Sequence, residues 1–141
     1  MLYVGVDLGT SAVKLLLMEA DGTIRNIVSK EYPLFLPHPG WSEQNPEDWL
    51  EKTLEGLQEL TRGYDSQQIA GIGVGGQMHG LVTLDDQDRP IRPAILWNDG
   101  RSEEETRYLN EEVGKKETLR IYGKHCICRL YSPKNTLDEK E

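Results

Sequence analysis

The sequence predicts one α/β domain built on a mixed sheet, and three observations support this fold class. Three short apolar runs rich in β-branched residues open the chain, an amphipathic segment with helical spacing follows, and another apolar run comes next. A series of βαβ units would alternate strands with helices, so this order favours a mixed sheet with flanking helices. A length of 141 residues suits one domain with its own core.

The first three expected strands lie close together in the sequence. Leu2–Val6 and Val13–Met18 are apolar and β-branched, and a short turn joins them. Asp21-Gly22 is a hairpin signal and precedes a third strand over Ile24–Tyr32. Three antiparallel strands are therefore expected to open the domain.

A proline-rich loop and the clearest helix of the sequence follow. The segment Pro33–Pro46 holds four prolines and is expected to be a loop, since proline cannot donate to a strand ladder. Asn45 then suits a helix N-cap, and Pro46 suits the first helical position. Apolar residues at helical spacing form one face of this helix: Trp49, Leu50, Leu54, Leu57 and Leu60.

Two further strands and a second helix are expected after this helix. Ile69–Val74 and Leu81–Leu84 have strand composition and flank the glycine-rich segment Gly75–Gly80. A helix is predicted from Ser102 to about Val113, because glutamates near its start favour the positive end of the helix dipole.

Charge and hydropathy exclude several classes of partner. The net charge is -8, with 24 acidic against 16 basic side chains, which disfavours nucleic acid because phosphates attract lysine and arginine. No apolar run reaches the roughly 18–20 residues that cross a bilayer, and the N-terminus lacks a signal-like pattern. We therefore expect no nucleic-acid partner, no membrane partner and a cytoplasmic protein.

The cysteines predict neither a disulfide nor a metal site. Cys126 and Cys128 are one residue apart, so in a strand they would point to opposite faces and could not easily pair. His125 lies beside them, but a zinc site needs about four ligands at recognised spacings.

One motif with phosphate-binding chemistry lies in the first turn. Asp7 ends the first expected strand and is suited to hold Mg²⁺ or its water, and Gly9 lets a backbone approach a phosphate. Thr10 and Ser11 offer hydroxyl and amide donors, and Lys14 follows on the next strand. An ordinary hairpin with an Asp-x-Gly turn is the alternative reading of these residues.

A second glycine motif imitates a dinucleotide loop. Gly71–Gly76 satisfies the spacing G-x-G-x-x-G. That motif binds a pyrophosphate only between a strand and a helix N-terminus, whereas a second strand is expected to follow here. Neither NAD nor FAD is therefore predicted.

Two glycine-containing turns carry groups suited to a polyhydroxylated ligand. Gln77, Met78 and His79 offer an amide, an apolar surface and an imidazole, while Asp99 and Arg101 add a carboxylate and a guanidinium. In the alternative reading His79 caps a turn, and Arg101 pairs with a glutamate of the following helix such as residue 104 or 105.

These pieces occur together in an order that resembles the FGGY carbohydrate kinase family. The run VGVDLGTSAVK resembles the opening phosphate motif of that family, and HPGWSEQNPEDW resembles its next block. GIGVGGQMHG and PAILWNDGR resemble the branch that phosphorylates D-xylulose, since glycerol kinases carry Arg-Glu where this chain has Met78-His79. The resemblance spans about Tyr3 to Tyr108.

The resemblance implies a fold, a reaction and a set of site residues. The fold would be the first lobe of a ribonuclease-H-like, actin-like ATPase, in incomplete form. The reaction would transfer the γ-phosphoryl group of ATP to D-xylulose, giving D-xylulose 5-phosphate. The residues implied for ATP and Mg²⁺ are Asp7, which would bind the metal, Gly9, Thr10, Ser11 and Lys14. The residues implied for D-xylulose or a related ketose are Gln77, Met78, His79, Asp99 and Arg101.

The chain also departs from the family in length. Family members are several times longer, and their catalytic base aspartate, second phosphate loop and adenosine pocket belong to later sequence that is absent here. No catalytic residue is therefore assigned, and the chain is expected to be inactive alone. Three alternatives stay open: a sugar-binding or regulatory module, one half of a split kinase completed by a second lobe or a homodimer, and a nonfunctional gene fragment.

The last residues depart from the family pattern in a way that suggests a frameshift. With permitted codons for Lys124–Asp138, reading one base later gives A-N-I-A-F-A-G-F-T-A-P-K-I-L-W-M, which resembles the block expected in the family. We therefore predict a kinase lobe over residues 1–116 and a divergent tail over 117–141, with a one-base frameshift near Lys115 to Glu117. Cys126 and Cys128 would then have no function.

Overall fold

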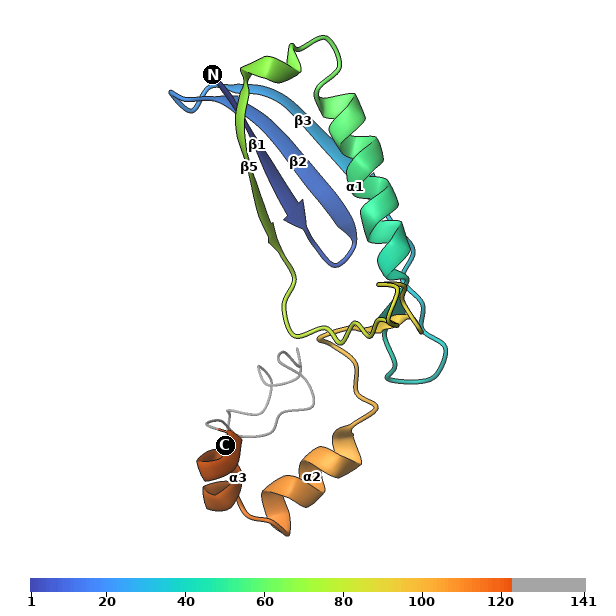
Figure 1. Ribbon diagram of the computed structural model, residues 1–141. Coiled ribbons are helices and arrows are strands. Elements are labelled where there is room, and N and C mark those ends of the chain that lie inside the picture. The colour runs from blue at the N-terminus through green and yellow to red at the C-terminus, as the bar shows by residue number, and fades with distance from the viewer. Residues whose placement is uncertain (123–141) are drawn as a thin grey trace, which may run out of the picture.

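The computed structural model describes residues 1–122, and its larger part is built on a four-stranded sheet, shown in the upper half of Figure 1. The strand order is β3-β2-β1-β5; β1 pairs antiparallel with β2 and parallel with β5, and β2 pairs antiparallel with β3. The strands are β1 (Leu2–Leu8), β2 (Ala12–Glu19), β3 (Ile24–Glu31) and β5 (Ile69–Gly76). The predicted mixed sheet and its three antiparallel opening strands are confirmed.

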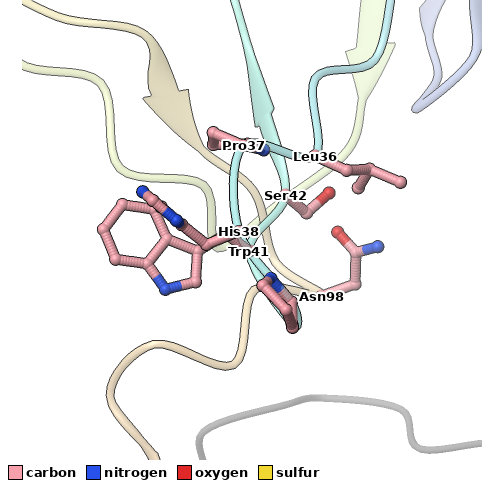
Figure 2. A pocket seen from close by; sticks show the side chains of 8 residues that line it. Leu36, Pro37, His38, Trp41, Ser42 and Asn98 are labelled. Carbon is pink, nitrogen blue, oxygen red and sulfur yellow. The ribbon is translucent and has the colours of Figure 1, made fainter.

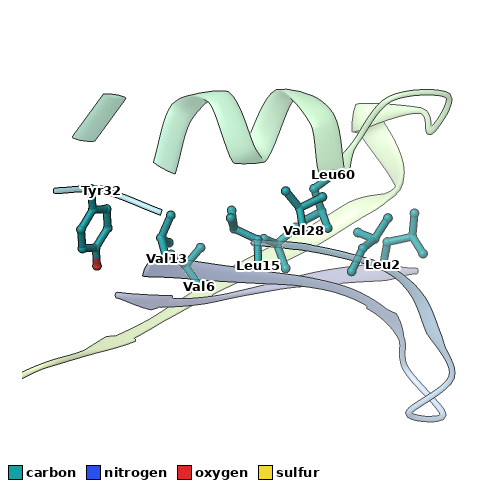
Figure 3. Packing of buried hydrophobic residues seen from close by; sticks show 9 residues of the cluster. Leu2, Val6, Val13, Leu15, Val28, Tyr32 and Leu60 are labelled. Atoms are coloured by element: carbon teal, nitrogen blue, oxygen red, sulfur yellow. The ribbon is translucent and has the colours of Figure 1, made fainter. Parts of the chain in front are cut away.

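One face of this sheet packs against helix α1 (Pro46–Leu60) to form the core. The buried core side chains come mainly from β1 and β2: Leu2, Val4, Val6, Val13, Leu15, Leu17, Val28, Tyr32 and Leu60 (Figure 3). An added Cβ at Gly56 of α1 would lie 2.4 Å from Leu15 Cδ1. The missing side chain at Gly56 therefore leaves room for Leu15 between the helix and the sheet.

Helix α1 begins where the sequence predicts it. The Asn45 side chain accepts a hydrogen bond of 3.3 Å from the Glu47 N–H, and Pro46 is the first helical residue. The predicted apolar face is only partly buried, because Leu50 and Leu54 are 63% and 51% exposed. At 100° per residue both lie toward one edge of the apolar stripe, on the side away from Gly56 and Leu60, which are buried.

A small second sheet joins the proline-rich segment to the later glycine turn. Strand β4 (Glu43–Gln44) pairs antiparallel with β6 (Ala94–Ile95), so the segment expected to be only a loop contains a two-residue strand. The expected strand at Leu81–Leu84 does not form. Leu81 pairs with β6 by an isolated bridge, and Leu84 faces Pro90, which has no N–H to donate to a longer ladder.

The remaining described elements are short helices. A 3₁₀ turn (Ser66–Gln68) precedes β5, and α2 (Glu103–Glu111) matches the second predicted helix, which was expected to extend slightly further. Helix α3 (Lys115–Tyr122) was not predicted; it packs on α2, away from the sheet, after Gly114 with a φ of 87° (Figure 1).

The boundary proposed between residues 116 and 117 falls within α3. Cys126, Cys128 and the rest of the proposed frameshifted tail beyond Tyr122 lie outside the described residues. Among residues 1–122, no helix is long and apolar enough to cross a membrane.

Candidate functional site

The turn predicted to bind phosphate, residues 8–11 and called the phosphate turn below, connects β1 and β2 at the end of the sheet. Asp7 stands opposite Lys14 on β2 and Gly75 on β5. Because Val6 and Val13 are buried against α1 and side chains alternate along a strand, the exposed Asp7 and Lys14 lie on the other face. The structure therefore places the predicted carboxylate and lysine together on the open face of the sheet.

Gly9 and Tyr32 shape the phosphate turn. The Gly9 N–H donates to the Ala12 carbonyl at 3.1 Å, and an added Cβ at Gly9 would lie 3.0 Å from that oxygen. The buried Tyr32 hydroxyl donates to the Gly9 carbonyl. Burial, and then the nearby charge of Asp7, raise the pKa of the Tyr32 phenol, so it keeps the proton that it donates.

The end of β5 lies against the phosphate turn. An added Cβ at Gly76 would be 3.0 Å from both the Leu8 Cβ and the Leu8 carbonyl oxygen, and the Gln77 N–H donates to that oxygen at 2.9 Å. Gly71–Gly76 lies entirely within β5 and leads into a turn, which lacks the helix N-terminus that a dinucleotide loop requires. Gly76 therefore allows the end of β5 to pack closely against Leu8.

Thr10 connects the phosphate turn to both segments predicted to contact the sugar. Its hydroxyl donates to Gln77 Oε1 at 3.1 Å and accepts from Trp97 Nε1, also at 3.1 Å. A threonine hydroxyl has one proton to donate. In this arrangement the Thr10 side chain is engaged within the protein, and Ser11, which is exposed, offers the other hydroxyl of the turn.

Gln44 of β4 is completely buried beneath these turns. Its Nε2 donates to the carbonyl oxygens of Thr10, at 2.7 Å, and Pro33, at 3.3 Å. Its Oε1 accepts from Trp49 Nε1 at 3.1 Å and from Gln77 Nε2 at 3.4 Å. Sequence reasoning missed this residue, and its place inside the block HPGWSEQNPEDW was the one signal that pointed to it.

The turn predicted to contact the sugar, residues 77–80 and called the sugar turn below, follows β5 and is open to solvent. Met78 is 71% exposed, and His79 is exposed with a φ of 64°. A positive φ is uncommon for residues other than glycine and costs conformational energy. The Met78 and His79 side chains are thus exposed, while the Gln77 side chain is bonded to Thr10.

Asp99 and Arg101 form a buried ion pair that fastens the proline-rich loop. Asp99 accepts 2.8 Å bonds from Arg101 N and Nε and a 2.6 Å bond from the Ser42 N–H. Arg101 also contacts Glu43 Oε1 at 2.7 Å and lies 3.7 Å over the Trp41 ring. The alternative pairing of Arg101 with a glutamate of the following helix is wrong, since Asp99 and Glu43 are its partners and the α2 glutamates are exposed.

The ionisation of this pair follows from its contacts. Burial is the largest single influence on Asp99 and opposes its charge, but the bonds from Arg101 and Ser42 together outweigh it and hold the Asp99 pKa below its usual value. The bond to Asp99 raises the pKa of Arg101. Both groups are therefore charged at neutral pH, and their described bonds run to residues 41–43 of the loop.

A surface hollow of 470 Å³ lies beside this ion pair (Figure 2). It is lined by residues 36–42 and Asn98, and the His38 and Trp41 rings meet edge to face with centroids 4.6 Å apart. Ser42 Oγ and Asn98 Oδ1 are buried there without a hydrogen-bond partner. None of the residues predicted to bind nucleotide or sugar lines this hollow.

The residues present fit Mg²⁺ only in company with a phosphate ligand. Among the described residues, no group of three or more His, Cys, Asp or Glu side chains could hold a metal ion together. Mg²⁺ is commonly held by one or two carboxylates together with substrate phosphates and waters. The exposed Asp7, beside the phosphate turn, is suited to that mode of binding.

Comparison with known proteins gives a consistent family. The model of the FGGY family of carbohydrate kinases, N-terminal domain, matches residues 2–134. Xylulose kinase of Escherichia coli K12 is 40% identical over 118 residues, covering 84% of this chain and 24% of the relative. Xylulose kinase of Bacillus subtilis 168 is 46% identical over 113 residues, and the match covers 79% of this chain and 23% of the relative.

Solved structures agree with the sequence comparison. The xylulose kinase of Rhodospirillum rubrum superposes with a TM-score of 0.77 at 31% identity, covering 84% of this chain and 25% of that one. A ligand-bound xylulose kinase of Lactobacillus acidophilus superposes with a TM-score of 0.78 at 28% identity, and the match covers 84% of this chain and 24% of that one. The predicted fold class, a ribonuclease-H-like, actin-like ATPase lobe, is confirmed. The chain spans about a quarter of the length of these relatives, and it belongs to the FGGY family of carbohydrate kinases.

Proposed function

We propose that this chain forms the sugar-facing and phosphate-facing part of an ATP-dependent xylulose kinase. The observation that carries the proposal is the double engagement of the Thr10 hydroxyl with Gln77 and Trp97. These bonds join a turn with phosphate-binding chemistry to two segments with polyol-binding chemistry. Phosphoryl transfer depends chiefly on holding a phosphate and an acceptor hydroxyl in a fixed relation, and such a junction serves that purpose.

On the phosphate side, we assign binding to the groups of the turn that face outward. Asp7 would hold the Mg²⁺ that accompanies ATP, and Lys14, on the same face, would neutralise phosphate charge. Gly9 leaves room for a phosphate to approach the backbone, and the exposed Ser11 hydroxyl would donate to it. Thr10 would contribute its backbone N–H while its side chain stays bound to Gln77.

On the sugar side, Met78 and His79 would contact D-xylulose. Both side chains are exposed on the sugar turn, where a thioether surface and an imidazole suit a carbon chain and its hydroxyls. Asp99 and Arg101 would act indirectly, by holding neighbouring segments in place. Their bonds to residues 41–43 fix the loop that precedes Gln44, and Trp97, close to them in sequence, reaches Thr10.

We further propose that additional polypeptide completes the site. Ile72 and Val74 of β5 are 59% and 75% exposed, although they share a sheet face with the buried Val4 and Val6. One further segment would cover them, and the base, the second phosphate loop and the adenosine pocket would come from further polypeptide beside the turns that follow β1 and β5. A second lobe in another chain, or a homodimer, would meet the same need. The alternative function is a sugar-binding or regulatory module that does not catalyse phosphoryl transfer. We expect the complete protein to act in the cytoplasm.

The proposal is tested by titration calorimetry and a coupled kinase assay on the purified chain. We expect D-xylulose and Mg-ATP to bind and turnover to be absent. Asp7→Ala should weaken Mg-ATP binding, while Asp86→Ala, at an exposed position, should leave it unchanged. Absence of binding by both ligands would contradict the proposal, and turnover that Asp7→Ala abolishes would contradict the need for further polypeptide.

A further inference from the structure

We propose that Gln44 is the positioning residue of this site and sets the sugar turn relative to the phosphate turn. This inference rests on the proposed kinase function. Gln44 is a polar residue with 0% exposure, in a two-residue strand between the proline-rich loop and α1. A buried amide is costly unless its donors and acceptors are satisfied, so its complete set of bonds calls for an explanation.

The donor side of Gln44 holds the backbone of the phosphate turn. Nε2 donates to the Thr10 carbonyl at 2.7 Å and to the Pro33 carbonyl at 3.3 Å. Pro33 follows β3, and Thr10 stands between β1 and β2. One NH₂ group therefore ties the phosphate turn to the end of the neighbouring strand, and an amide NH₂ has the two protons that this requires.

The acceptor side of Gln44 holds the sugar turn. Oε1 accepts from Gln77 Nε2 at 3.4 Å, and the Gln77 Oε1 accepts from the Thr10 hydroxyl at 3.1 Å. Thr10, Gln44 and Gln77 thus form a closed ring of three hydrogen bonds. Trp49 Nε1 of α1 also donates to Gln44 Oε1, at 3.1 Å, which anchors the ring to the core helix.

The ring explains why a glutamine is required at this position. A carboxylate would place an oxygen against the Thr10 and Pro33 carbonyls, and an apolar side chain would leave Trp49 and Thr10 without their partners. Trp97 donates to the Thr10 hydroxyl and shares no described bond with Gln44. A substitution at Gln44 should nevertheless change the environment of the Trp97 indole, because Thr10 belongs to the ring. That transmitted effect separates a positioning role from local packing.

The first test reads the ring without any ligand. The chain has three tryptophans, so a ¹H–¹⁵N spectrum gives three indole signals. With Gln44→Met, which preserves side-chain length, we expect the signals of Trp49 and Trp97 to move and that of Trp41 to stay. The control is Gln58→Met at an exposed position of α1, which should move none of them.

Circular dichroism shows whether Gln44→Met folds, and a second variant keeps the inference testable if it does not. Gln77→Met opens the same ring from a less buried position, and it should shift both the Trp49 and the Trp97 signals. If Trp97 does not move in a folded Gln44→Met variant, or in Gln77→Met where the first variant fails to fold, the inference is wrong.

The second test measures D-xylulose binding by calorimetry at a temperature where all variants are folded. Loss of the ring's bonds should weaken binding about tenfold in Gln44→Met and leave Gln58→Met at the wild-type affinity. Wild-type affinity in Gln44→Met would overturn the positioning role. If the wild-type chain binds neither D-xylulose nor Mg-ATP, the proposed function fails, while the indole signals still decide whether Gln44 orders the two turns.

Discussion

Thr10 and Gln77 stand 67 positions apart in the sequence and share a hydrogen bond of 3.1 Å between Oγ1 and Oε1. The bond brings the turn after β1 to the turn after β5, which is the end of the sheet where open α/β folds commonly bind ligands. It also engages the only proton of the Thr10 hydroxyl within the protein. The Thr10 side chain therefore holds together the segments of the candidate site by bonds within the protein.

Thr10→Val should destabilise the protein. The change keeps the volume of the side chain but leaves the Trp97 indole N–H without its acceptor and Gln77 Oε1 without its donor. We expect a loss of about 1–3 kcal/mol in the free energy of unfolding, measured by urea denaturation.

Thr83→Val is the matched control for this change, because Thr83 Oγ1 is buried without a hydrogen-bond partner. Removing that hydroxyl should leave stability unchanged or raise it. Equal losses in the two variants would show that the Thr10 hydrogen bonds contribute nothing specific.

Gly56→Ala should destabilise the contact between α1 and the sheet. The new methyl would lie 2.4 Å from Leu15 Cδ1, and Leu15 is fully buried and held by its neighbours. Overpacking of about 1–3 kcal/mol exceeds the gain of roughly 1 kcal/mol in helix propensity, so we expect a net loss of about 1 kcal/mol. Gly73→Ala, which meets no atom within 4 Å, should be close to neutral. Chemical denaturation of both variants checks the sign, and a more stable Gly56→Ala protein would contradict the close approach.

Asp99 should make the folded state sensitive to acid. Its pKa is held below the usual value, so its contribution to stability is fully present above the unfolded pKa of about 3.9 and is lost as the pH falls through the lower folded pKa. Asp99→Asn should lower stability at pH 7 by about 2–4 kcal/mol, because Arg101 loses a buried partner.

The difference in stability between Asp99→Asn and wild type should become smaller as the pH falls below about 4. Asp86→Asn changes an exposed carboxyl and serves as the control. Thermal unfolding at a series of pH values gives the result, and a constant difference down to pH 2 would refute the role of the Asp99 charge.

Tyr32→Phe should loosen the phosphate turn while preserving the core. The ring stays buried, but the Gly9 carbonyl loses its donor, which should cost about 1 kcal/mol in unfolding experiments. Because the folded pKa of Tyr32 is raised, its contribution holds below about pH 10 and declines as the pH rises through the folded value. Wild type should therefore lose stability in alkali more steeply than Tyr32→Phe, and Tyr108→Phe, at an exposed residue, should behave as wild type.

The sequence predicts the elements that local patterns determine. The hairpin at Asp21-Gly22, the cap at Asn45 and the strand periodicity of β1 and β2 each involve neighbouring residues, and all three are found in the structure. The pairing of β4 with β6 was missed, because it joins segments about fifty residues apart through only two residues each.

The candidate site was predicted as a set of residues but not as a set of contacts. Asp7 and Lys14 share an open face, as a phosphate site requires, but the inward turn of Thr10 and Gln77 follows from packing that no local pattern reveals. Gln44 was invisible for the same reason, since its four partners come from four separate segments. Motif spelling indicates which chemistry is present, and tertiary contacts decide which groups remain available for a ligand.

The most direct measurement is calorimetric titration of the chain with D-xylulose and, in parallel, with glycerol. The exposed Met78 and His79 of the sugar turn are expected to bind D-xylulose and to discriminate against glycerol. We predict saturable binding of D-xylulose that His79→Ala weakens, with no detectable binding of glycerol. Equal binding of the two compounds, or binding of D-xylulose unaffected by His79→Ala, would contradict the assignment of this turn to the sugar.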